Sequence, residues 1–199
     1  FMDSDDFAHP QKLERQVAQF VKNKQLQGVI HQCIRIDEDS NIEFRGVGSF
    51  RMSCISLMIR ASVIEKMGYF DSLRVGADTD FFERIVAVFG PISVLELPDL
   101  TLFMMRHSTS LTGGGPFHIS WRSVAGPRLT HHLNFRRWHQ SIRQGQSDGY
   151  LRAHLVERPF EVSDLQMSTH HHWNEGTPLF SELIKARKEN WWTKGKDMW

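Results

Sequence analysis

Apolar residues recur along the chain at two spacings, which predict a series of helices and strands. Apolar positions repeat every three or four residues, as in amphipathic helices, over residues 10–24, 61–67 and 78–89. Short apolar runs bounded by turn residues predict strands, and these runs cover residues 28–36, 42–47, 54–59, 92–97 and 101–105. The first two runs flank a polar turn, so we expect them to form a β-hairpin.

The pattern changes after residue 117, where arginines alternate with tryptophans and aliphatic residues at helical spacing. We therefore predict a first domain over residues 1–116 and a mainly helical C-terminal extension over residues 117–199. Arg and Trp at such spacings commonly form the solvated and packed faces of a helix, so they do not indicate a nucleic-acid or membrane surface. Beyond residue 150, only the segment 179–186 has a helical period.

The composition is that of an ordinary globular protein, with 40% hydrophobic residues, 24% charged residues and a formal net charge of +1. This balance excludes binding to nucleic acid or anionic lipid through overall charge alone. Cys33 and Cys54 lie within apolar runs, which predicts buried free thiols and a reducing, cytoplasmic compartment. No apolar run approaches the ~20 residues that a membrane-spanning helix needs.

Acidic residues cluster directly after Phe1 and Met2. If that dipeptide ends a buried parallel strand, Asp3, Asp5 and Asp6 stand at the carboxyl edge of a sheet, where ligands of open α/β folds bind. Carboxylates suit Mg²⁺ or Mn²⁺, which bind few protein oxygens and complete their shell with substrate phosphates. The alternative role is an N-cap for the first predicted helix, and the residues alone leave both roles open.

A second group of polar residues opens the helix predicted over residues 78–89. Asp78 stands at its first position, where the residues alone favour an N-cap. Asp80 and Arg84 lie four residues apart, which is the spacing of an ion pair on a helix surface.

Arg106 and His107 follow the last predicted strand of the first domain. A lone histidine carries little information, and an unliganded surface position explains His107 as well as a ligand role does. The runs His131–His132 and His170–His172 do not indicate a zinc site, because consecutive histidines cannot all point at one ion and no cysteine pair accompanies them.

Three blocks in this order resemble the C-terminal half of the catalytic domain of family 2 glycosyltransferases. The acidic cluster Asp3–Asp6 and the segment His9–Glu14 come first, and the three blocks that follow in order are Cys54–Arg60, Val63–Asp71 and Gly76–Arg84. The resemblance covers about residues 1–112. It implies an α/β fold with a mixed sheet of GT-A type, truncated at its N-terminus and followed by a mainly helical region. The earlier strands of the sheet, and most contacts to the donor's base and ribose, would then lie upstream.

The resemblance also implies roles for the acidic residues. In that family the acidic motif binds the nucleotide-sugar and a divalent metal, which assigns the nucleotide-sugar to Asp3 and Asp6 and the metal to Asp5. Asp78 corresponds to the catalytic base, although Ala77 replaces the acid that usually precedes it.

The remaining roles follow from the same comparison. Asp80 and Arg84 become substrate-binding residues on the acceptor side, Arg106 a contact to the donor diphosphate, and His107 a further metal ligand.

The implied function is inverting, Mn²⁺- or Mg²⁺-dependent transfer of a sugar from a nucleotide-diphosphate donor to a hydroxyl of a saccharide or similar acceptor. Nucleic acid is not expected as a partner. The expected location is the cytoplasm or the cytoplasmic face of the membrane, with peripheral membrane association through upstream or C-terminal parts. The alternatives are a non-catalytic interaction module, whose acids only cap helices, and a metal-dependent phosphohydrolase.

Overall fold

The computed structural model describes residues 2–3, 5–43, 50–107, 117, 126–153, 155 and 157–167. All of these belong to one compact unit that spans residues 1–167. The His170–His172 run and the segment 179–186 lie outside the described residues.

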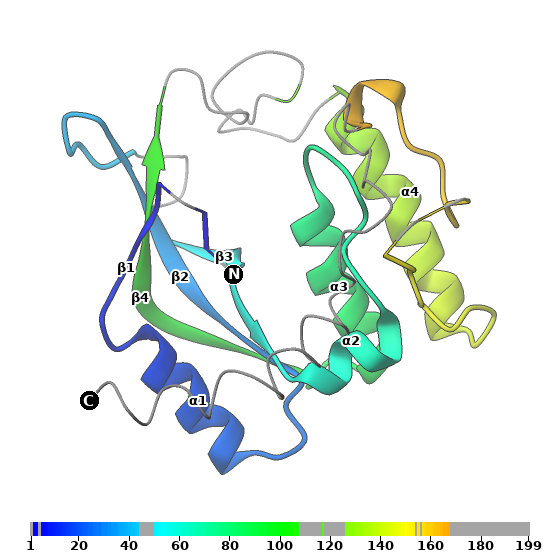
Figure 1. The fold of residues 1–199 in the computed structure, drawn as a ribbon, viewed down its shortest axis with the longest axis horizontal. Helices are drawn as coiled ribbons and strands as arrows, with labels where there is room; N and C mark the ends of the chain where they lie inside the picture. Colours follow the sequence, from blue (N-terminus) through cyan, green and yellow to red (C-terminus); the bar gives the residue numbers. More distant parts are fainter. Residues whose placement is uncertain are drawn as a thin grey trace, which may run out of the picture. The chain divides into compact units, whose positions relative to one another are not determined.

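A mixed sheet of four strands forms the centre of the unit, with the strand order β1-β4-β2-β3 (Figure 1). The strands are β1 (Phe7–Ala8), β2 (Gly28–Asp37), β3 (Arg51–Ile59) and β4 (Val94–Arg106). β2 and β4 are parallel, whereas β1 pairs with β4 and β3 pairs with β2 in the antiparallel sense. The fold is therefore α/β, and the carboxyl ends of β2 and β4 meet at one edge of the sheet.

The helices agree with the spacing of apolar residues. They are α1 (Lys12–Lys22), α2 (Ala61–Met67), α3 (Ala77–Phe89) and α4 (Gly126–Arg143), followed by a 3-10 turn at Asp164–Gln166. Gly68 and Gly90 follow α2 and α3 with φ of 72° and 94°, a backbone region that glycine enters without strain. The predictions over residues 10–24, 61–67 and 78–89 are thus confirmed.

The prediction of two separate strands over residues 92–97 and 101–105 is wrong, because β4 is continuous from Val94 to Arg106. Its pairing with β2 passes from Leu97 to Leu100, so Pro98 and Asp99 bulge out of the ladder. Proline has no N–H to donate, and a bulge lets a strand continue past it.

The expected hairpin is present where the structure describes it. Ile36 and Ile42 form an antiparallel bridge, and the Glu43 N–H donates to the Arg35 carbonyl at 2.9 Å. Residues 44–47 of the expected second strand lie outside the described residues. The main antiparallel partner of β2 is β3, which is longer than the predicted strand over residues 54–59.

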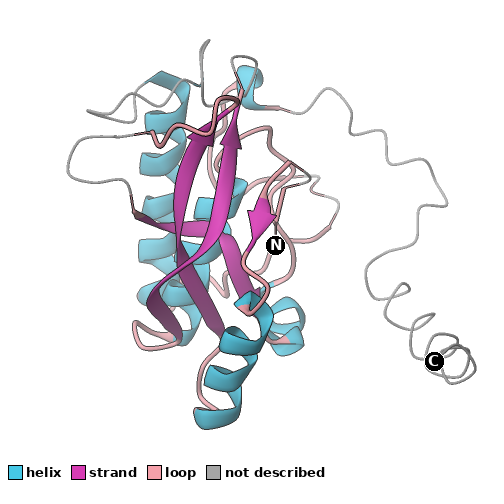
Figure 2. Cartoon of the chain, turned by 90° about the vertical axis from the view of Figure 1, so that its left-hand side faces the viewer, coloured by secondary structure: helices cyan, strands magenta, loops and turns pink. Residues whose placement is uncertain are grey.

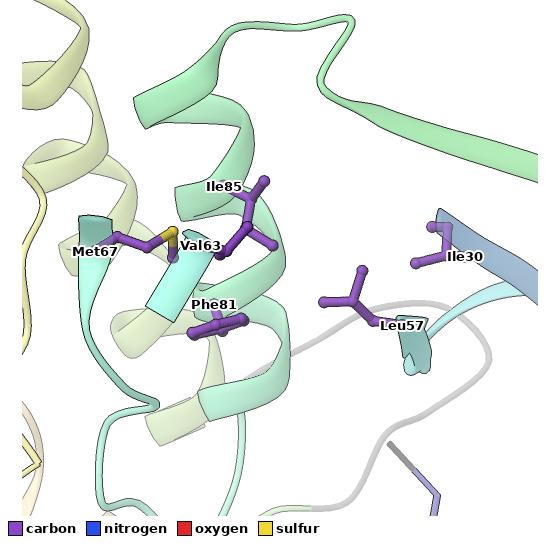
Figure 3. Packing of buried hydrophobic residues seen from close by; sticks show 6 residues of the cluster. All are labelled: Ile30, Leu57, Val63, Met67, Phe81 and Ile85. Atoms are coloured by element: carbon purple, nitrogen blue, oxygen red, sulfur yellow. The ribbon is translucent and has the colours of Figure 1, made fainter. Parts of the chain in front are cut away.

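The core lies between the sheet and the helices α2 and α3. Figure 3 shows strand residues Ile30 and Leu57 directed toward side chains of the two helices. All members of this cluster are at most 1% exposed, and they are Ile30, Leu57, Val63, Met67, Phe81 and Ile85.

Helix α4 packs on the outer side of α3, which therefore lies between the sheet and α4 (Figure 1). Figure 2 shows the sheet in front with helices behind it. Trp138 and Ile142 of α4 contact Ala87 of α3 and Leu151 of the following loop. The predicted boundary at residue 116 does not coincide with the unit, because α4 and the residues through 167 belong to it. Residues 144–163 are largely irregular where they are described.

Helix α1 is held in part by a buried polar side chain, Gln16, while the apolar Phe20 of the helix is partly buried. The Gln16 side-chain amide donates to the carbonyls of Val29 at 3.1 Å and Ser56 at 2.8 Å. The apolar residues at helical spacing, Leu13, Val17 and Val21, are 62%, 49% and 63% exposed. The spacing predicted the helix but not which face it buries.

Candidate functional site

A cavity of about 550 Å³ opens where the carboxyl ends of β2 and β4 face the N-terminal ends of α3 and α4. Side chains from the acidic cluster, from both strands and from both helices line it. This is the edge of a sheet at which α/β proteins bind ligands. Four predicted site residues share the wall of this cavity with Asp78, namely Asp3, Asp5, Asp6 and Arg106.

Asp6 is the most deeply placed member of the acidic cluster, with 9% of its surface exposed. Its Oδ1 accepts a hydrogen bond of 3.1 Å from the Met105 N–H, while its Oδ2 is buried without a hydrogen-bond partner in the described part of the chain. Burial raises the pKa of Asp6 to about 6, and repulsion from Asp3 and Asp5 adds to the effect. The acidic cluster is therefore a group of carboxylates that raise one another's pKa.

Asp3 is influenced by charges both of the acidic cluster and of α3. Its pKa is raised first by burial and then by the negative charges of Asp5 and Asp78. Asp78 thus lies close enough to the acidic cluster to influence it, although the two are far apart in the sequence.

Asp78 does not cap its helix. The N-cap of α3 is Gly76, with φ of 84°, and this residue makes no side-chain capping hydrogen bond. A Cβ at Gly76 would lie 2.8 Å from Nδ1 of His131, so both the backbone and the neighbouring side chain require glycine here. Asp78 is the second residue of α3, where the helix dipole favours a carboxylate.

The acidic cluster does not cap a helix either. The N-cap position of α1 is Gln11, and its side chain makes no capping hydrogen bond. The capping alternative for Asp5, Asp6 and Asp78 is therefore wrong in this structure.

Arginines line the same cavity. Arg106, at the end of β4, forms an ion pair with Glu43. Three further arginines in the cavity wall were not singled out from the sequence: Arg35 of β2, Arg74 before α3, and Arg128 of α4. The charge of Arg35 acts to lower the pKa of Asp6.

His107 stands beside the cavity rather than in its wall. Its Nε2 lies 3.8 Å from Oδ2 of Asp5, and its Nδ1 lies 3.0 Å from Oε1 of Glu38. The two residues assigned to a metal by resemblance, Asp5 and His107, are therefore neighbours.

Asp80 and Arg84 are not brought to the cavity. Both side chains are fully buried between α3 and α4, so the predicted pair on a helix surface is wrong. Oδ1 of Asp80 lies 2.8 Å from Nε2 of His139 in α4. The Arg84 guanidinium donates to the carbonyl of Tyr69 at 2.5 Å. Asp80 joins the two helices, and neither Asp80 nor Arg84 lines the cavity.

The acidic cluster, and not the cavity as a whole, has the charge that suits a divalent cation, because the cavity wall carries four aspartates and four arginines. In the part of the chain that the structure describes, no three His, Cys, Asp or Glu side chains are grouped to hold a metal ion. A Mg²⁺ or Mn²⁺ ion that also binds substrate phosphates needs only one or two carboxylates. Such an ion would relieve the repulsion among the carboxylates of the cluster.

No protein-family model matches the chain, and no curated protein matches it. No helix among the described residues is both long and apolar enough to cross a membrane. Cys33 and Cys54 are free thiols, the first buried and the second partly buried. Burial raises the pKa of the Cys54 thiol to about 12, so it is not a nucleophile at neutral pH.

Proposed function

We propose that this protein is an inverting glycosyltransferase of the GT-A type, which moves a sugar from a nucleotide-diphosphate donor to a hydroxyl of a saccharide or similar acceptor. The observation that carries the proposal is the meeting of Asp78 with the acidic cluster and with several arginines in one cavity. The mixed sheet, with the cavity at the carboxyl ends of its parallel strands, is compatible with this fold type.

The charges of the cavity suit both parts of such a reaction. Inverting transfer needs one carboxylate to remove the proton of the acceptor hydroxyl as the hydroxyl oxygen attacks the anomeric carbon. We assign this role to Asp78, which is partly exposed at the N-terminal end of α3 and lines the cavity. Arg35 and Arg106 approach from the sheet, where their guanidinium groups can bind the oxygens of the donor diphosphate.

Asp5 and His107 are the residues that would hold a Mn²⁺ or Mg²⁺ ion, because they lie next to each other and beside the cavity. Such an ion, when bound, offsets the negative charge of the departing diphosphate. Asp3 and Asp6 complete the carboxylate wall against which the donor would lie.

The interaction module is less well supported, because its acids would serve as helix caps and the caps are Gln11 and Gly76. A phosphohydrolase would use the same acidic cluster. It would release phosphate without an acceptor and would need no carboxylate at the start of α3.

Replacing Asp78 by Asn tests the proposal. Loss of a carboxylate from the first turn of α3 should lower the free energy of unfolding by less than about 1 kcal/mol. The amide cannot accept the acceptor's proton, so the transfer rate of the full-length protein should fall by ~10² to 10⁴ while donor affinity persists. Glu83→Gln on the same helix, outside the cavity wall, is the control and should transfer at the rate of the unsubstituted protein. Full activity of Asp78→Asn would remove Asp78 as the base.

A further inference from the structure

The position of Arg128 is unfavourable for a positive charge. It lies in the first turn of α4, only 7% exposed, and its side chain lines the cavity. The N-terminal end of a helix carries a partial positive charge, which repels a guanidinium, and this turn contains no acidic residue. Taking the charge out of water is a second cost.

The hydrogen-bonding capacity of Arg128 is also not fully used. Its Nε is buried without a hydrogen-bond partner among the described residues. Burial lowers the pKa of Arg128, and the charge of Asp78 only partly opposes this effect. A cation that is buried, repelled by a helix dipole and incompletely hydrogen-bonded is costly for the fold, unless an anion binds it when the protein functions.

The arginines on the sheet side of the cavity differ in this respect. Arg106 pairs with Glu43, and Arg35 acts on Asp6. On the helix side, Arg128 shares the cavity wall with Arg74, whose guanidinium lies 5.6 Å from the centre of the Phe117 ring. The cavity therefore has cations on two walls: beside the acidic cluster, and beside Asp78.

We propose that Arg128, with Arg74 beside it, binds a carboxylate or phosphate carried by the acceptor, so that the acceptor is an anionic saccharide rather than a neutral one. This inference rests on the proposed function, because it takes the side of the cavity next to the base as the acceptor side. The fork of N–H donors in a guanidinium matches the paired oxygens of either group. Arg128 would thus determine specificity, and Asp78 would act on a hydroxyl of the molecule that Arg128 holds.

The test compares sugars that differ only in charge. The full-length protein is titrated with glucose, glucuronate and glucose 6-phosphate, and separately with uridine diphosphate, by calorimetry or protein-observed NMR. Either anionic sugar should bind at least about tenfold more tightly than glucose, as a charge-assisted hydrogen bond allows. Arg128→Gln should remove this difference and leave the affinity for uridine diphosphate unchanged.

Two further variants separate binding from folding. Arg137→Gln removes the same charge from an exposed position of α4 outside the cavity wall, and it should keep the preference for anionic sugars. Arg128→Lys keeps the charge but not the fork, so it should fold and retain only part of the preference. The melting temperature of Arg128→Gln should not fall, whereas a purely structural arginine would lower it.

Three results would overturn the proposal. They are no preference for anionic sugars in the unsubstituted protein, an unchanged preference in Arg128→Gln, and an Arg128→Gln variant that loses affinity for uridine diphosphate and not for anionic sugars. The last result would assign Arg128 to the donor. Failure of the proposed function would be a separate result, in which nucleotide-sugars are neither bound nor consumed. The difference in affinity between charged and neutral sugars does not depend on that result, because it is measured without any donor.

Discussion

The imidazole of His131 should make the protein sensitive to acid. This residue of α4 is 1% exposed and lies among aromatic rings, with the centre of Phe135 at 5.0 Å and that of Phe160 at 5.7 Å. Neither ring nitrogen has a hydrogen-bond partner among the described residues. Burial lowers the pKa of His131 from 6.5 to about 4.

The charged groups around the ring do not reverse this effect. Asp80 favours the protonated imidazole, whereas His132, Arg128 and Arg158 oppose it. The pKa of His132 is itself lowered by burial. Protonation of His131 in the folded protein is therefore unfavourable at any pH above about 4.

The effect on stability follows from proton linkage. Below pH 6.5 the unfolded chain takes up a proton at this position and the folded chain does not, so stability is lost as the pH falls toward 4. With these two pKa values the loss at pH 5 is about 2 kcal/mol, and at pH 8 it is negligible. His131→Leu removes the titrating group and keeps an apolar side chain of similar size in the cluster.

Urea unfolding at pH 8 and pH 5, followed by tryptophan fluorescence, measures this loss. The free energy of unfolding of His131→Leu should fall by about 2 kcal/mol less between the two pH values than that of the unsubstituted protein. Phe135→Leu is the control in the same cluster, and its destabilisation should be equal at both pH values. Equal pH dependence in His131→Leu and the unsubstituted protein would refute the reasoning.

Two further predictions concern the buried pair and the metal. Arg84→Met should lower the free energy of unfolding by about 3–5 kcal/mol, because it leaves buried carbonyls and the Asp80 carboxylate without their cation. The control, Arg136→Met at an exposed ion pair, should lower it by at most about 1 kcal/mol. Equal losses of the two variants in urea unfolding would show that Arg84 is not structurally important. Asp5→Asn should abolish the Mn²⁺-dependent part of uridine diphosphate affinity in calorimetry, with the exposed Asp39→Asn as control, and unchanged Mn²⁺ dependence would exclude Asp5 as a ligand.

The sequence predicted those elements whose signals are local. Periodic apolar residues followed by glycine marked α2 and α3, because both the period and the left-handed backbone at Gly68 and Gly90 are properties of a short segment. The break predicted at Pro98 was wrong because a bulge, which depends on the partner strand, lets β4 continue.

Burial and long-range contacts were harder to predict. Asp80 and Arg84 have the spacing of a surface pair, and only the packing of α4 over α3 buries them. Arg128 was one arginine among several in a basic segment, and nothing local distinguishes it from the exposed Arg137. The acidic residues of the cavity were predictable because they are clustered in the sequence or open a predicted helix, and Arg106 because it ends a predicted strand. Arg35, Arg74 and Arg128 became visible only in the fold.

The most direct test of sugar transfer is to identify the product. The full-length protein is incubated with Mn²⁺, a panel of α-linked nucleotide-sugars and mixed saccharide acceptors, and the products are followed by NMR. We predict that at least one donor releases its nucleoside diphosphate only when an acceptor is present, and that the new glycosidic bond has the inverted, β configuration. Release of phosphate or nucleotide without an acceptor, or retention of the α configuration, would contradict an inverting transfer assisted by Asp78.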